Sequence, residues 1–133
     1  MKITGVTTFL AHPGVGKNLC FVKLDTDEGL HGWGECYTQS DRDLQVVAHV
    51  DQLERYLVGR DPFNIKHFTQ MAYDDIAGRR GAMDFYCAIS GLEQAMWDIA
   101  GKAAGVPVYQ LLGGKVREKI RLHLLMGGSM QDG

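Results

Sequence analysis

Apolar residues recur every three to four positions between Asp84 and Ala104, the spacing of one face of an α-helix. The repeat consists of Phe85, Ala88, Ile89, Leu92, Ala95, Met96, Ile99 and Ala103. The opposite side of the segment is also mostly apolar, so we expect a long helix that is buried on several sides. Gly105 stands where a left-handed C-cap is expected, and Pro107 can open a short second helix. Three apolar residues are predicted to pack this second helix back onto the domain: Val108, Leu111 and Leu112.

The first forty residues follow a different pattern, rich in β-branched and aromatic residues and interrupted by glycine. Residues 2–10, 18–25 and 30–37 are predicted to form three strands, the second of them apolar on both faces. The connections between them are short, which predicts an antiparallel meander that needs helices over one face. Trp33 and Trp97 are expected in the core. Gly32 and Gly34 are expected to allow close backbone packing.

Two more helices are predicted between the meander and the long helix. Ser40 is a good N-cap, with Asp41 and Asp43 in the first turn. The buried stripe of this helix is expected to be Leu44, Val47, Val50, Leu53 and Leu57. The Asp61-Pro62 pair predicts the start of the next helix. Its inner face is expected to consist of Ile65, Phe68, Ala72 and Ile76. After the long helix, residues 119–126 alternate again and predict one more strand.

Two stretches of the chain resemble a known family. The run AISGLEQAMWDIAGKAAGVPVYQLLGG, residues 88–114, closely resembles the segment that joins the capping domain to the barrel in the mandelate racemase and muconate lactonizing branch of the enolase superfamily. The stretch DTDEGLHGWGE, residues 25–35, resembles the second hairpin of the same capping domain. The resemblance implies an α+β fold, in which a three-stranded antiparallel meander precedes a helical bundle. It also implies that residues 1–115 are the capping domain and that 116–133 begin a (β/α) barrel whose remainder is absent from this chain.

The resemblance implies a magnesium-dependent enzyme that removes the proton alpha to a substrate carboxylate. In that family the metal ligands and bases lie on later barrel strands, so no catalytic or metal residue is expected in these 133 residues. The loop 11–17 matches the family's specificity loop in position, and His12 and Lys17 are its candidates for substrate contact. Arg79 and Arg80 could clamp a carboxylate or hydroxyl group. The alternatives are a solvated loop for the first pair, and a solvated turn or an intersubunit salt bridge for the second.

The polar character of these candidates favours a sugar-acid dehydratase, with a small carboxylate as substrate. A racemase or epimerase and a cycloisomerase of the same superfamily are alternatives, and so is a non-catalytic interaction module if the chain is natively 133 residues long. The long apolar helix argues against a free-standing module, because it would expose a large patch without a barrel to cover it.

Composition and charge limit the kinds of partner and the cellular location that we expect for this protein. The net charge is -2 and no basic cluster exceeds Arg79-Arg80, which argues against nucleic-acid and membrane partners. Cys20, Cys36 and Cys87 match neither a disulfide framework nor a zinc site, so we expect buried thiols in a cytoplasmic protein. No apolar run reaches the ~18 residues of a membrane helix. We also expect a homo-oligomer.

Overall fold

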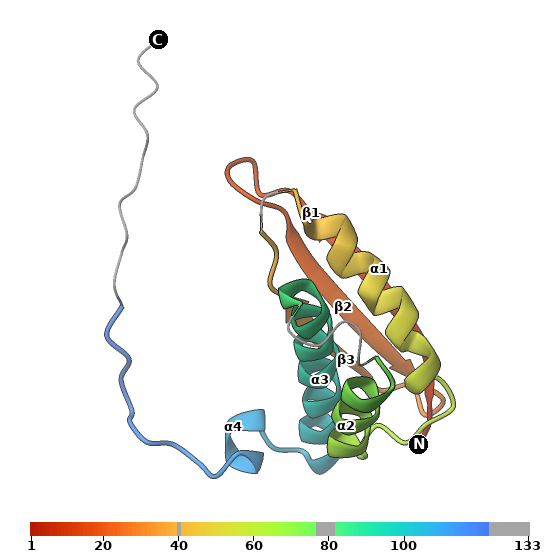
Figure 1. The fold of residues 1–133 in the computed structure, drawn as a ribbon. Helices are drawn as coiled ribbons and strands as arrows, with labels where there is room; N and C mark the ends of the chain where they lie inside the picture. Colours follow the sequence, from red (N-terminus) through yellow and green to blue (C-terminus); the bar gives the residue numbers. More distant parts are fainter. Residues whose placement is uncertain (40, 77–81, 123–133) are drawn as a thin grey trace.

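The structure is a computed structural model that describes residues 1–39, 41–76 and 82–122. A three-stranded sheet comes first in the chain and helices follow (Figure 1). The elements are β1 (Ile3–Ala11), β2 (Leu19–Thr26), β3 (His31–Cys36), α1 (Asp43–Leu53), the 3-10 turn η1 (Glu54–Tyr56), α2 (Ile65–Asp75), α3 (Met83–Ala104) and α4 (Val108–Leu111). The predicted order of three strands, two helices and a long helix is confirmed.

The sheet has the order β1-β2-β3, and both strand pairs are antiparallel, as predicted. Side chains on β2 alternate between a buried face and a half-buried face. α1 and α3 cover the buried face (Figure 1). Trp33 lies on the other face, 41% exposed and with its ring 5.3 Å from that of Phe9. It is therefore not a core residue, whereas Trp97 is half-buried against the core.

Glycines allow α3 to lie directly on β3, as expected for Gly32 and Gly34. A Cβ atom at Gly32 would lie 2.0 Å from the carbonyl oxygen of Ala95. A Cβ atom at Gly34 would lie 1.9 Å from the carbonyl oxygen of Gly91. Contacts this short are impossible for real side chains, so the closeness of helix and strand depends on hydrogen at both positions.

Side chains of α3 also satisfy the free edge of β3. The backbone N–H of Trp33 donates to Asp98 Oδ2 at 2.9 Å, and that of Glu35 donates to Gln94 Oε1 at 3.1 Å. One turn further along the helix, Lys102 Nζ donates to the carbonyl oxygen of His31 at 2.8 Å. An edge strand otherwise presents unpaired backbone groups that another chain can bind. Here side chains of α3 form hydrogen bonds with these groups of β3.

α1 differs from its prediction in start and in buried face. It begins at Asp43, after Arg42, and Asp41 precedes it with a left-handed φ of 63°. Ser40 lies outside the described residues. The residues that bury are Val46, Val50, Leu53 and, beyond the helix, Leu57. Leu44 is 68% exposed and Val47 is half-buried. The predicted stripe began with steps of three residues, whereas the buried positions 46, 50, 53 and 57 follow the 3.6-residue period of the helix more closely.

α2 begins later than predicted. The Asp61 carboxylate accepts a hydrogen bond from the Phe63 N–H at 2.9 Å, which makes a local turn, and the helix starts only at Ile65. The predicted inner face is confirmed at Ile65, Phe68 and Ala72, which are buried. Ile76 is partly buried against the core.

The long helix α3 is confirmed, and so is its C-cap at Gly105, which has a φ of 68°. Of the predicted stripe only Ala103 is exposed. The packing expected of α4 is wrong at Leu111 and Leu112, which are 38% and 64% exposed. Residues 119–122 are not in a strand, and the rest of the predicted strand, 123–126, lies outside the described residues.

Candidate functional site

A polar cleft lies where two connections meet at one end of the sheet. The loop between β1 and β2 forms one wall, and the segment between β3 and α1 forms the other. The cleft has a volume of about 320 Å³ and is lined by His12, Gly16, Lys17, Asn18, Gln39, Asp41 and Asp43. Gly14 and Gly16 have φ values of 94° and 76°, so glycine is needed for this loop to turn. The two predicted residues of this loop, His12 and Lys17, thus share one cleft.

A chain of hydrogen bonds crosses the polar cleft through Asn18. Its Nδ2 donates to Asp43 Oδ2 at 2.6 Å, and its Oδ1 lies 3.0 Å from His12 Nδ1. Because the carboxylate can only accept, the orientation of the Asn18 amide is fixed and His12 Nδ1 must donate. In a neutral imidazole the other nitrogen, Nε2, is then an acceptor. The arrangement leaves His12 able to accept a hydrogen bond from a ligand hydroxyl.

Lys17 is anchored on the opposite wall. Its Nζ donates to the carbonyl oxygen of Thr38 at 2.6 Å and lies 3.4 Å from the centre of the Tyr37 ring. The buried Thr38 hydroxyl in turn donates to the backbone carbonyl of Asn18. An ammonium group has three N–H donors, so the Thr38 contact leaves capacity for a ligand. Cation-π and hydrogen-bond contacts together hold this charge at the cleft.

The segment between β3 and α1, which forms the second wall, is also held by an ion pair to α3. Arg42 Nη2 lies 2.6 Å from Asp84 Oδ2, and Asp84 is only 7% exposed at the start of α3. Asp41, next in the chain, is the one non-glycine residue with a positive φ among the residues that the structure describes. Uncommon backbone conformations of this kind concentrate at functional sites. Sequence reasoning missed four polar lining residues, Asn18, Gln39, Asp41 and Asp43, because only the fold brings 12–18 beside 39–43.

Removing the Asn18 side chain is expected to raise the pKa of Asp43. That pKa lies below its ordinary value, chiefly because the Asn18 amide donates to the carboxylate, with a smaller contribution from the Leu44 N–H. A carboxyl group whose pKa is lower in the folded state than in the unfolded state stabilises the fold at pH values above its unfolded-state pKa. This stabilisation is lost as the pH falls through the folded-state pKa. NMR titration of the carboxyl carbon should therefore show a higher pKa in Asn18→Ala. Asn64→Ala, at the start of α2, is the control, and an unchanged pKa in Asn18→Ala would contradict the assigned cause.

Arg79 and Arg80 lie outside the described residues, so their contact with a carboxylate or hydroxyl group stays a prediction. No group of three His, Cys, Asp or Glu side chains suited to a metal is found within 1–39, 41–76 and 82–122. None of the helices in the described part of the chain is both long and apolar enough to cross a membrane.

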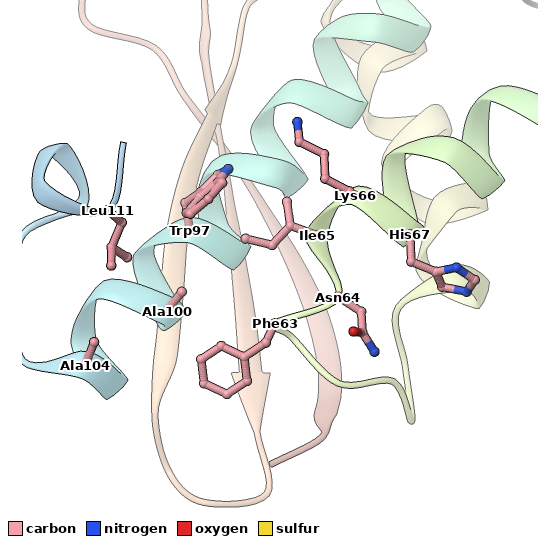
Figure 2. Close-up of a pocket in the computed structure, with 9 residues that line it drawn as sticks. All are labelled: Phe63, Asn64, Ile65, Lys66, His67, Trp97, Ala100, Ala104 and Leu111. Atoms are coloured by element: carbon pink, nitrogen blue, oxygen red, sulfur yellow. The ribbon is translucent and has the colours of Figure 1, made fainter. Parts of the chain in front are cut away.

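An apolar groove lies along the second half of α3 (Figure 2). It has a volume of about 530 Å³ and is lined by the start of α2, the second half of α3 and α4. Phe63, Ile65, Trp97, Ala100, Ala104 and Leu111 supply its apolar surface (Figure 2). Phe63 is 50% exposed there. Exposed apolar surface of this kind is typical of an interface.

A three-stranded antiparallel meander, helices over one face and a polar cleft at one end together define an α+β domain of the capping type. The chain belongs to the family described as mandelate racemase / muconate lactonizing enzyme, N-terminal domain, whose model matches residues 9–113. This match confirms the resemblance found in the sequence.

Curated relatives and solved structures agree with the family. The chain is 46% identical over 129 residues to D-galactonate dehydratase of Verminephrobacter eiseniae and 47% identical over 129 residues to that of Pectobacterium atrosepticum, covering 96% of this chain and 32% of each relative. It thus spans about a third of their length. An enolase from Agrobacterium radiobacter with bound sodium and L-malate matches with a TM-score of 0.82 and 38% identity, over 92% of this chain and 30% of that one. A mandelate racemase/muconate lactonizing enzyme from Sulfitobacter matches with a TM-score of 0.80 and 36% identity, over 89% and 31%.

Proposed function

We propose that this chain is the capping domain of a sugar-acid dehydratase of the enolase superfamily. The observation that carries the proposal is the identity of 46% and 47% to two D-galactonate dehydratases over nearly the whole chain. The parent enzyme is proposed to bind magnesium through residues of its barrel domain, not of this chain. A homo-oligomeric assembly is a further part of the proposal. Cytoplasmic location is supported by the free thiols of Cys20, Cys36 and Cys87.

The polar cleft is proposed to set the specificity of this enzyme. A sugar acid presents several hydroxyl groups and one carboxylate, and the polar cleft offers matching partners. His12 Nε2 and the Asp41 carboxylate can accept from hydroxyls, and the spare N–H groups of Lys17 can donate to oxygen. Arg79 and Arg80 are proposed to act on the same ligand. Capping domains that close over a site also exclude water from it.

The apolar groove is proposed to pack against the rest of the parent protein. Its surface is apolar along α2, α3 and α4, and the relatives continue well beyond the region that this chain matches. Residues 116–133 are proposed to begin the barrel. A racemase or epimerase, or a cycloisomerase, of the same family remains the second candidate, because the family includes racemases and lactonizing enzymes by its description. An interaction module of 133 residues is the third.

Grafting residues 1–115 onto the barrel of the Verminephrobacter eiseniae D-galactonate dehydratase, in place of its own N-terminal domain, tests the proposal. We expect the chimera to convert D-galactonate to its 2-keto product, because the capping domain supplies specificity and the barrel supplies the chemistry. In this chimera, His12→Ala is expected to raise KM roughly ten-fold, the cost of one lost hydrogen bond to a ligand of about 1–1.5 kcal/mol.

Two comparisons make this test specific. His31→Ala removes a histidine at the opposite end of β3 from the polar cleft and should leave KM unchanged. The barrel without a capping domain should be inactive. A folded chimera that epimerises acids without dehydrating them would favour the second candidate, and a folded chimera with neither activity would contradict the proposal.

A further inference from the structure

Two of the three cysteines lie directly opposite each other in the sheet. Cys20 on β2 and Cys36 on β3 are partners in the strand register, and both side chains point to the buried face. Their exposed fractions are 0% and 1%. Both cysteines are free.

The register places this pair within the reach of a disulfide. Directly opposite residues in antiparallel strands have Cα atoms about 4.5–5.5 Å apart, and disulfides join Cα atoms about 4.4–6.8 Å apart. Neither strand needs to move along the other for the sulfur atoms to bond. The neighbouring Cys36 thiol lowers the pKa of Cys20, whereas Cys20 and burial raise the pKa of Cys36, so Cys20 supplies the thiolate that reacts.

Strand ends give an oxidant its access to this buried pair. Cys20 is the second residue of β2 and Cys36 is the last residue of β3, so local opening of these strand ends would be enough to expose both, without unfolding of the domain. The third cysteine, Cys87, is half-buried on α3, one turn before Gly91. A Cβ atom at Gly91 would lie 2.3 Å from Cys36 Sγ, so the helix packs tightly over the pair.

We propose that Cys20 and Cys36 form an oxidisable dithiol at the base of the polar cleft. With hydrogen peroxide as oxidant, one thiol ionises and its thiolate attacks a peroxide oxygen, which breaks the O–O bond and gives a sulfenic acid and hydroxide; the proton that the thiol released converts the hydroxide to water. The second thiol then displaces the hydroxyl group as water and forms the S–S bond. Overall, two thiols and one peroxide give one disulfide and two waters. A thiol such as glutathione reverses the reaction by exchange.

A disulfide between Cys20 and Cys36 would affect the polar cleft because the pair lies at the end of β2 and β3 next to the cleft. Asn18 precedes β2 and Thr38 follows β3, each two residues from its cysteine on the side of the cleft, and the Thr38 hydroxyl donates to the Asn18 carbonyl. A disulfide between β2 and β3 therefore joins the two walls of the polar cleft through a covalent bond. Opening of those walls becomes coupled to the redox state of the dithiol.

Oxidation of the folded chain with hydrogen peroxide, followed by thiol titration in denaturant, tests the inference. We expect the number of titratable thiols to fall from three to one and the mass of the chain to fall by about 2 Da, as one disulfide requires. Peptide mapping should find the bond between Cys20 and Cys36. Dithiothreitol should restore all three thiols.

Two variants and one solvent condition separate this outcome from nonspecific oxidation. Cys87→Ser should still lose two thiols, whereas Cys36→Ser should keep both of its remaining thiols. Oxidation in concentrated urea should give mixed pairings that include Cys87, because the unfolded chain no longer holds the register. The inference is overturned if the folded chain keeps three thiols under peroxide, or if its main product links Cys87 to another cysteine or to a second chain.

Discussion

Gly34→Ala is expected to destabilise the fold by about 3 kcal/mol or more, at the upper end of what overpacking costs. The new methyl group would lie 1.9 Å from the Gly91 carbonyl oxygen and 3.0 Å from the Ala95 backbone nitrogen. Both contacts are with helix backbone, which cannot turn aside as a flexible side chain can. Either β3 or α3 must therefore move away, and the hydrogen bonds from Trp33 and Glu35 to α3 lengthen with it. Urea unfolding followed by circular dichroism measures the loss as a lower midpoint.

Gly5→Ala is the matched control for this substitution. Gly5 lies in β1 of the same sheet, has no atom within 4 Å of where its Cβ would be, and does not have a positive φ. Its replacement should leave stability unchanged or raise it by a few tenths of a kcal/mol, because alanine has less backbone freedom in the unfolded chain. Equal losses for the two variants would show that the contact between β3 and α3 is not what makes glycine necessary at Gly34.

The sequence was most predictive where one local pattern decided the outcome. The spacing of apolar residues in α3 follows the helical period over six turns, and its end is specified by Gly105, so the helix and its buried face were both predicted. Gly32 and Gly34 were expected to allow close packing, which the structure confirms. The start of α2 was predicted too early because Asp61 can cap a helix or form a local turn, and the local sequence does not distinguish the two.

The parts that escaped prediction depend on contacts between distant segments. Trp33 was expected in the core from its residue type alone, but the helices cover the other face of the sheet. His12 and Lys17, which line the polar cleft, were predicted as substrate contacts from the position of their loop in the family resembled. Asn18 and Asp43 are 25 positions apart, and only the return of the chain after β3 brings them together. No periodicity or spacing in the sequence encodes that pairing.

Phe85→Ala is expected to cost about 3–5 kcal/mol of stability, the range for deleting a fully buried aromatic ring. Phe85 is 0% exposed in the first turn of α3, where its ring meets His49 at 5.7 Å and Tyr86 at 5.4 Å. The surrounding backbone belongs to two helices that also hold the wall of the polar cleft through Arg42 and Asp84. A cavity there cannot close without moving those helices. The loss of stability should therefore be well above the transfer free energy of the deleted phenyl group alone.

Phe63→Ala is the comparison that distinguishes the core from the apolar groove. The same atoms are removed, but Phe63 is 50% exposed, so urea unfolding should show a loss below about 1 kcal/mol. In the chimera with the D-galactonate dehydratase barrel, the order of the two effects should reverse if the groove faces the barrel: Phe63→Ala should then affect the contact between the domains more than Phe85→Ala does. Phe63→Ala would then weaken association of the two domains although it leaves the isolated domain stable. A large loss of stability for Phe63→Ala in the isolated chain would instead make the groove part of the core of this domain.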